Sequence, residues 1–160
     1  MIVVADSSPL IYLSVLGRLE VLRGLYGTIL VPRAVYDEVV VAGEGEPGSR
    51  EVASAGWIDV RDVVIDESWA ALEARLDPGE AAAIVLALKV GADLLVVDDR
   101  AGRREATAAG LRIHGTLGVL VEARRSGLLQ ALRPEIDALV AAGFRVSERA
   151  RVEVLALVGE

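Results

Sequence analysis

The sequence predicts an α/β fold: a three-layer α/β/α sandwich built on a parallel sheet of 4–5 strands, with a C-terminal helical appendage. Short apolar runs alternate along the chain with segments in which apolar residues recur at helical spacing. Such alternation is typical of parallel sheets, because each helix carries the chain back to the start of the next strand. A chain of 160 residues fits one such domain.

The strands are expected where apolar and β-branched residues run together. In chain order these runs are Ile2–Val4, Ile29–Val31, Trp57–Val60, Leu94–Val97 and the short edge strand Arg112–His114. The helices are expected between them: 10–22 with a break near Gly17, one from Pro32 through Val40, 49–55, 67–75, an alanine-rich helix ending at Val90, one ending at Ala109, and 117–125. Ser8 is expected to cap the first helix ahead of Pro9.

The chain is expected to divide into an α/β domain, residues 1–126, and a helical extension, residues 127–160, packed on the same domain. The extension contains two amphipathic segments, 129–142 and 147–158. No apolar run approaches the ~18 residues that span a bilayer, and the first residues lack the basic start of a signal peptide. We therefore expect a cytoplasmic protein without a membrane partner. Its hydrophobic content of 53% suggests excess apolar surface and hence a homo-oligomer.

Composition excludes several kinds of chemistry. The chain has no cysteine, which excludes disulfides, thiol catalysis and zinc–thiolate sites, and His114 is its one histidine. The net charge is −7, whereas a protein that holds phosphates by its overall charge is usually basic. Any contact with nucleic acid must therefore come from local arginines and from metal ions. The stretch Gly43–Gly48 matches the pattern G-x-G-x-x-G, but it follows a helix and contains Pro47, so we interpret it as a flexible loop.

Four acids from distant parts of the chain are expected near one edge of the sheet. Asp6 and Asp98 each follow an apolar strand, and the carboxyl ends of parallel strands meet at the same edge. Glu38 lies within two turns of the end of the second strand, and Glu80 lies in the first turn of the helix that leads to the strand before Asp98. Grouped carboxylates repel each other unless a cation lies among them, and oxygen-only ligands favour Mg²⁺ or Mn²⁺.

Each acid also has a plainer explanation. Asp77 and Glu80 have the spacing of a capping box, so capping and metal binding remain alternatives for Glu80. Asp98 or Asp99 could cap the following helix, and Glu38 could be a solvated helix residue. Asp6 is the acid that packing explains least, because it directly follows a buried strand and precedes two serines.

Basic residues cluster in the C-terminal half of the chain. These are Arg100, Arg103, Arg104, Arg112, Arg124 and Arg125. They form either a solvated face or a surface for phosphates near the edge that carries Asp98. His114 is interpreted as the end of a strand and not as a catalyst.

Together these segments resemble a PIN domain, in the branch of small prokaryotic PIN proteins related to VapC toxins. The resemblance rests on the order and spacing of several motifs across nearly the whole chain. They are Val3-Val-Ala-Asp6-Ser-Ser-Pro-Leu-Ile11, Val31-Pro-Arg-Ala-Val-Tyr-Asp-Glu38, Gly79-Glu80, Leu94-Leu-Val-Val-Asp98-Asp99 with Arg103, Gly115-Thr116-Leu-Gly-Val-Leu120 and Gly143-Phe-Arg-Val-Ser147.

The resemblance implies a metal-dependent ribonuclease, often dimeric and inhibited by an antitoxin protein. It implies that Asp6, Glu38, Glu80 and Asp98 are the catalytic metal ligands, with Asp99 as a fifth candidate. Ser7 or Ser8 would support Asp6, and Thr116 would likewise lie behind the metal ligands. The chain departs from the family pattern in having glutamate at position 80, where aspartate is usual, and Thr116 where some members add an acid. The choice between Asp98 and Asp99, and between one metal ion and two, therefore stays open.

Our hypothesis from the sequence is hydrolysis of RNA phosphodiesters with Mg²⁺ or Mn²⁺, in which Arg103, with Arg100 or Arg104, holds the backbone phosphates. The alternative is a non-catalytic module of the same fold that binds RNA or protein. An aspartate-nucleophile phosphatase is disfavoured, because that chemistry wants a second acid two residues after the first and Ser8 stands there.

Overall fold

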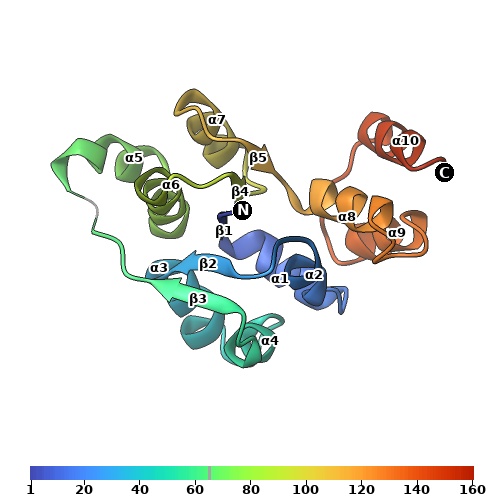
Figure 1. Ribbon diagram of the computed structural model, residues 1–160, viewed down its shortest axis with the longest axis horizontal. Helices are drawn as coiled ribbons and strands as arrows, with labels where there is room; N and C mark the ends of the chain where they lie inside the picture. The colour runs from blue at the N-terminus through green and yellow to red at the C-terminus, as the bar shows by residue number, and fades with distance from the viewer. Residues whose placement is uncertain (65) are drawn as a thin grey trace.

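A computed structural model describes residues 1–64 and 66–160, and it confirms the predicted fold class (Figure 1). Its strands are β1 (Val3–Ala5), β2 (Ile29–Pro32), β3 (Ile58–Arg61), β4 (Leu94–Val96) and β5 (Ile113–His114). They form one parallel sheet in the order β3-β2-β1-β4-β5. The expected strands are therefore all present, with ends shifted by a residue or two, and β5 lies at an edge as predicted.

The strand order creates a switch point beside β1. From β1 the chain proceeds outward through β2 to β3, and then returns to place β4 on the other side of β1. Val3 of β1 is accordingly in register with Ile29 of β2 and with Leu94 of β4. The loops that leave β1 and β4 turn toward opposite edges of the sheet, and this arrangement opens a crevice outside their carboxyl ends. Asp6 follows β1 and Asp98 lies just beyond β4, so both acids stand at this crevice.

Helices cover both faces of the sheet. Alternate strand residues face opposite sides: Val3 and Ala5 belong to one buried apolar cluster, and Val4 belongs to the other. The first cluster is covered by α1 (Ser7–Val15), α2 (Glu20–Tyr26), α3 (Arg33–Tyr36), α4 (Ser49–Ser54) and α8 (Thr116–Arg125). The second is covered by α5 (Ala70–Arg75), α6 (Pro78–Val90) and α7 (Arg100–Ala108).

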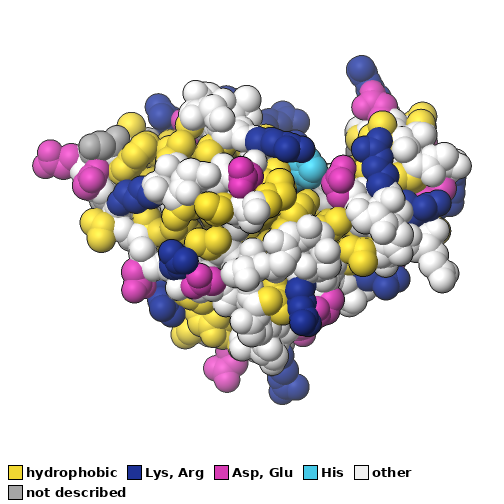
Figure 2. All heavy atoms as spheres, viewed as in Figure 1, with side chains coloured by type: hydrophobic (Ala, Val, Ile, Leu, Met, Phe, Trp, Pro, Cys, Tyr) yellow, Lys and Arg dark blue, Asp and Glu magenta, His cyan; other side chains and the backbone are white. Residues whose placement is uncertain are grey.

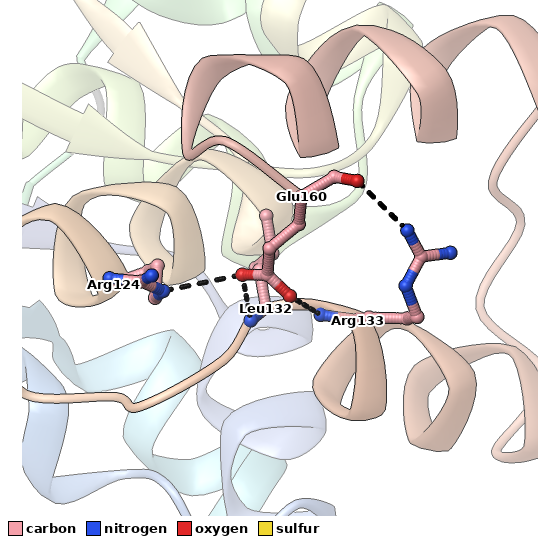
Figure 3. A network of polar contacts seen from close by, with 4 residues as sticks. All are labelled: Arg124, Leu132, Arg133 and Glu160. Atoms are coloured by element: carbon pink, nitrogen blue, oxygen red, sulfur yellow. Dashed lines mark hydrogen bonds and ion pairs between the residues drawn. The ribbon is translucent and has the colours of Figure 1, made fainter.

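The last two helices share the first cluster with β1. They are α9 (Arg133–Ala141) and α10 (Glu148–Leu157), and Leu132, Ile136 and Leu139 are completely buried among residues of the sheet and α8. The Glu160 carboxylate joins these helices, because it accepts the backbone N–H of Leu132 at 2.7 Å and that of Arg133 at 3.1 Å (Figure 3). Residues 127–160 thus contribute to the same core as the strands. Among the described residues, no helix is long and apolar enough to cross a bilayer.

Three local features differ from the sequence prediction. The helix after β2 is α-helical only over α3 and then widens into a π-helix, η1 (Asp37–Ala42), which includes Glu38. A second short segment, η2 (Glu67–Trp69), is a 3-10 helix ahead of α5. The predicted cap of α1 was wrong: Asp6, not Ser8, is the N-cap residue, and the Asp6 carboxylate makes no capping hydrogen bond. Ser8 is already helical because the turn begins directly after β1.

Candidate active site

A pocket of about 870 Å³ lies outside the carboxyl ends of β1 and β4. Its acidic residues come from five elements or their flanks: Asp6, Glu38, Asp77, Glu80, Asp98 and Asp99. All five acids predicted from the sequence therefore line one pocket. Asp77 is the sixth, and the sequence had indicated it only as a helix cap. Strand ends and helix starts supply every one of these residues, as expected where parallel strands and helix N-termini meet.

Asp6 is the most deeply buried of these acids, with 4% of its surface exposed. Burial raises the pKa of its carboxyl to about 7, and the nearby charges of Asp77, Glu38 and Asp98 act in the same direction. The backbone N–H of Ser7 opposes this rise in pKa. A carboxylate in this position is costly at neutral pH unless a proton or a cation accompanies it.

Glu38 and Asp98 are held by hydroxyl groups. Ser7 Oγ donates to Glu38 Oε2 at 2.5 Å, and Ser8 Oγ donates to Asp98 Oδ2 at 3.1 Å. Thr116 donates to Asp98 twice, from its backbone N–H at 2.7 Å and from its hydroxyl at 2.6 Å. We had expected Ser7 or Ser8 to support Asp6; both hydroxyls contact other acids, and it is the backbone N–H of Ser7 that contacts Asp6. Because α1 begins at Ser7, its first turn directs these hydroxyls toward η1 and the end of β4 instead.

Asp77 and Asp99 cap helices. Asp77 is the N-cap of α6 and accepts the backbone N–H of Glu80 at 2.8 Å, which confirms the capping predicted for this position. Asp99 is the N-cap of α7 and accepts the N–H of Gly102 at 3.1 Å. A hydrogen bond from the Glu80 carboxyl, and then that of Gly102, lower the pKa of Asp99. Both capping residues line the same pocket.

Glu80 stands between the two capping acids. Its Oε2 atom is buried, and no N–H or O–H of another described residue donates to it. Burial, followed by the neighbouring Asp77 and Asp99 carboxylates, raises the pKa of Glu80 to about 9. At neutral pH, Glu80 therefore carries a proton that it shares with these neighbours. A cation placed among the three carboxylates would satisfy the same oxygen atoms without that proton.

Two glycines allow the helices to approach these acids closely. A Cβ atom on Gly79 would lie 2.9 Å from Glu38 Oε2, and one on Gly102 would lie 3.0 Å from Glu80 Oε2. Both distances are shorter than ordinary van der Waals contact, so a side chain at either position would displace the carboxylate. The first turns of α6 and α7 thus form walls against which Glu38 and Glu80 pack.

The acids share a pocket, but their side chains do not converge on one point. Among residues 1–64 and 66–160, no group of three or more Asp, Glu or His side chains is arranged to hold a metal ion. Within that same part of the chain, none of the six acids forms an ion pair with a basic side chain. Hydroxyl groups instead face Glu38 and Asp98, and backbone N–H groups face Asp6, Asp77 and Asp99. Glu80 lies between two of these acids, and its buried Oε2 atom has no donor among the described residues.

The predicted phosphate-binding arginines are only partly at the site. Arg100 lines the acid pocket. Arg103 donates to the backbone oxygen of Val97 at 3.2 Å and lines two adjoining pockets. Arg104 lines neither the acid pocket nor the two adjoining pockets that contain Asp98. Arg124 and Arg125 pair with Glu160 and Glu122 and line none of the three pockets that contain Asp98, so the predicted cluster of arginines is divided.

Two aromatic residues and one arginine that line the acid pocket were not predicted from the sequence. Tyr12, Phe144 and Arg145 line the acid pocket, the last two from the segment that joins α9 to α10. No spacing rule brings this distant segment to β1, since tertiary packing alone decides where it lies. The one signal was its presence in the motif Gly143-Phe-Arg-Val-Ser147.

His114 lies outside the acid pocket, at the end of β5 in an adjoining pocket with Arg103 and Phe144. Its Nδ1 atom is buried and has no hydrogen-bond partner among the described residues. Burial lowers the pKa of the imidazole, so the ring is neutral at physiological pH. This position agrees with its interpretation as a strand-end residue.

Comparison with known proteins adds one match. A family model described as a PIN domain covers residues 2–160, which is nearly the whole chain and includes both α9 and α10. No curated protein matches the sequence.

Proposed function

The chain belongs to the PIN-domain family, and on that premise we propose that it is a metal-dependent ribonuclease that hydrolyses RNA phosphodiester bonds. PIN domains are generally nucleases, so a hydrolase is the coarse assignment that the family supports. The finer proposal depends on one observation. Six carboxylates line a single pocket at the switch point of the sheet, and none of them has a basic partner among the described residues.

The donor set suits Mg²⁺ or Mn²⁺. All candidate ligands are carboxylate oxygens, the ligand type that these cations prefer over nitrogen or sulfur. Burial raises the pKa values of Asp6 and Glu80, so a nearby cation would offset the cost of ionising them, and the buried Oε2 atom of Glu80 has no donor among the described residues. We propose Asp6, Glu38, Glu80 and Asp98 as the ligands, with Asp99 as a fifth. When bound, such an ion lowers the pKa of a water molecule and neutralises charge on the phosphate.

The residues around the acids have supporting roles in this proposal. Ser7, Ser8 and Thr116 fix the orientation of Glu38 and Asp98 through the hydrogen bonds described above. Arg100 lines the pocket and is available to a substrate phosphate, and Arg103 lines the adjoining pockets that share Asp98. The negatively charged acids repel other anions from the pocket. A phosphate group of RNA therefore binds there only where a cation or an arginine offsets the charge of the acids.

A non-catalytic RNA- or protein-binding module is the second candidate, and one observation favours it. As the side chains stand, no three of the described acids form a ready-made metal site. A module of this kind would bind RNA without metal and would not turn it over. Binding of Mn²⁺ therefore separates the two functions before any activity is measured.

The experiment that tests the proposal compares wild type with Asp6→Asn. Cleavage of single-stranded RNA is followed in EDTA, Mg²⁺ and Mn²⁺, and Mn²⁺ affinity is measured separately by calorimetry. We expect cleavage by wild type with either metal, and a loss of both cleavage and Mn²⁺ affinity in Asp6→Asn. Equal cleavage by the two proteins, or cleavage by wild type in EDTA, contradicts the proposal.

From the resemblance to VapC toxins we further propose a homodimer and an antitoxin protein as partner. Figure 2 shows apolar side chains at the surface among charged ones on one face of the molecule. Exposed apolar residues include Val41, Val64 and Val152, with 64%, 73% and 58% of their surfaces exposed. Sedimentation equilibrium tests the dimer, and co-expression with the product of the neighbouring gene tests the antitoxin.

A further inference from the structure

The segment that joins α9 to α10 forms one wall of the acid pocket. Phe144 and Arg145 lie in this segment and line the pocket, although they are far from Asp6 in the sequence. Phe144 also lines the adjoining pocket that contains His114, and Arg145 also lines the one that contains Ser147. All three pockets include Asp98. They therefore form one groove that continues from the acids along this wall.

Arg145 is an unpaired cation in a strongly acidic surrounding. Nine arginines elsewhere form ion pairs with Asp or Glu. Arg145 is exposed and, within the described part of the chain, forms neither an ion pair nor a side-chain hydrogen bond, despite the six acids that line the same pocket. Its five N–H donors are thus free for an anion from solution. In a protein of net charge −7, such local cations must supply any attraction to phosphate.

Phe144 places an aromatic ring next to this cation. The ring packs edge to face against Tyr12 of α1, with 4.9 Å between the ring centroids and 86° between the ring planes. Phe144 is only partly buried, and both rings line the acid pocket. The contact with Tyr12 fixes the orientation of Phe144 while leaving part of the ring accessible from the groove. Proteins that bind single-stranded nucleic acid combine aromatic faces for bases with cations for the backbone.

We propose that Phe144 and Arg145 form a nucleotide-binding wall that holds single-stranded RNA beside the acids. Arg145 contacts a backbone phosphate adjacent to the scissile one, and Phe144 stacks on an unpaired base. This inference rests on the proposed function for the identity of the substrate, but the two can fail separately. The proposal assigns the α9–α10 segment a role in substrate binding in addition to the roles of the acids, Arg100 and Arg103.

Binding of a short fluorescein-labelled oligouridine, measured by anisotropy in EDTA and in Mg²⁺, tests the wall. Arg145→Gln and Phe144→Leu are the variants. Arg149→Gln is the matched control, because Arg149 is exposed nearby on α10 and pairs with Glu153 at 3.0 Å outside the groove. We expect each variant to weaken binding about tenfold and the control to bind like wild type. The slope of log affinity against log salt should fall by about 0.7 for Arg145→Gln.

Further variants separate substrate contact from a structural effect. Arg145→Lys keeps the charge and should recover most of the affinity. Phe144→Leu should leave the binding of duplex RNA unchanged, because a duplex offers no unpaired base. In cleavage assays with Mn²⁺, Arg145→Gln should raise KM with kcat nearly unchanged. Thermal unfolding shows whether Phe144→Leu is folded, and Arg145→Gln carries the test alone if it is not.

The outcomes separate the wall from the proposed function. Wild-type affinity in both variants, or no binding of the oligonucleotide by wild type in either buffer, overturns the wall. If wild type cleaves RNA and Arg145→Gln has an unchanged KM, the proposed nucleotide-binding wall is contradicted, whereas the proposed ribonuclease function stands. If both variants bind the oligonucleotide more weakly but wild type cleaves RNA with no metal tested, the proposed ribonuclease function is contradicted, whereas the proposed nucleotide-binding wall stands.

Discussion

Thr116 holds both carboxylate oxygens of Asp98. Its backbone N–H donates to Oδ1 at 2.7 Å, and its hydroxyl donates to Oδ2 at 2.6 Å. Ser8 donates to the same Oδ2 atom at 3.1 Å, so α8 and α1 together fix an acid that follows β4. The resemblance implied that Thr116 supports the metal ligands, at a position where some relatives have an acid. Through these two hydrogen bonds Thr116 orients the acid that is present.

Replacing Thr116 by valine should destabilise the protein by about 1–2 kcal/mol. Valine keeps the shape of the fully buried threonine but removes the hydroxyl donor to a charged group. The backbone N–H remains, so Asp98 keeps one bond from this residue. Urea denaturation measures the free energy of unfolding. Thr107→Val, at an exposed position on α7, is the control and should change that free energy by less than about 0.5 kcal/mol.

Asp6 should make the protein less stable as the pH rises. Its folded-state pKa of about 7 lies above the ordinary value of 3.8 for an aspartate, so the folded state binds the proton more tightly than the unfolded state. The stabilisation from this proton is complete below pH 4 and is lost as the pH rises to 7. Relative to wild type, Asp6→Asn should therefore gain up to about 4 kcal/mol of stability between pH 4 and pH 8.

Urea denaturation in EDTA at a series of pH values measures this gain, and EDTA removes any contribution from metal. Asp37→Asn removes an exposed acid from η1 and serves as the control. A constant difference between Asp6→Asn and wild type from pH 4 to pH 8 would show that the Asp6 carboxyl does not titrate in this range.

Adding Mn²⁺ should offset the loss of stability that the ionised Asp6 carboxylate causes at neutral pH. An ion that binds only the folded protein stabilises it, by about 2.7 kcal/mol at a concentration 100 times Kd. We expect Mn²⁺ to raise the Tm of wild type at pH 7.5 and to release protons from the pocket, since Asp6 and Glu80 must ionise to bind it. Neither effect should occur in Asp6→Asn. Equal rises in Tm for both proteins would place the Mn²⁺ site elsewhere.

Much of this architecture follows from local sequence. Val3–Ala5 and Leu94–Val96 are strands because buried apolar runs between turns leave the chain few other choices. Asp6 and Asp98 could then be placed at one edge, because parallel strands end on the same side. The caps at Asp77 and Asp99 follow in the same way, since each depends on a residue three positions later.

The remaining features depend on long-range packing. Ser7 donates to Glu38, 31 residues away, only because η1 widens and brings that glutamate over the start of α1. The sequence alone is equally compatible with a hydrogen bond from the Ser7 hydroxyl to Asp6. Phe144 and Arg145 reach the pocket because α9 packs on α8 and β1, which no local pattern specifies. Side-chain partners at the site were therefore beyond the reach of spacing rules.

Glu160 should give the protein a pH dependence of the opposite sign. Its carboxylate accepts the N–H groups of Leu132 and Arg133 at the start of α9 and pairs with Arg124 of α8 (Figure 3). The Leu132 N–H, followed by that of Arg133 and by the Arg124 guanidinium, lowers the pKa of Glu160 below the ordinary value of 4.5 for a glutamate. Glu160 thus contributes stability above pH 4.5, and this contribution is lost as the pH falls through the lowered pKa.

Glu160→Gln should consequently lower the Tm at pH 7 and have a smaller effect at pH 3. The two N–H groups bond to different oxygens of Glu160, so glutamine, with one carbonyl oxygen, keeps only one of these acceptors, and it lacks the charge that attracts the start of α9 and Arg124. Glu153→Gln is the matched control, because Glu153 forms an exposed pair with Arg149 on α10 and caps no helix. If Glu160→Gln and Glu153→Gln lower the Tm equally at pH 7, then α9 does not depend on the Glu160 charge. A larger loss for Glu160→Gln also predicts weaker RNA binding in that variant, since α9 leads directly into the segment with Phe144 and Arg145.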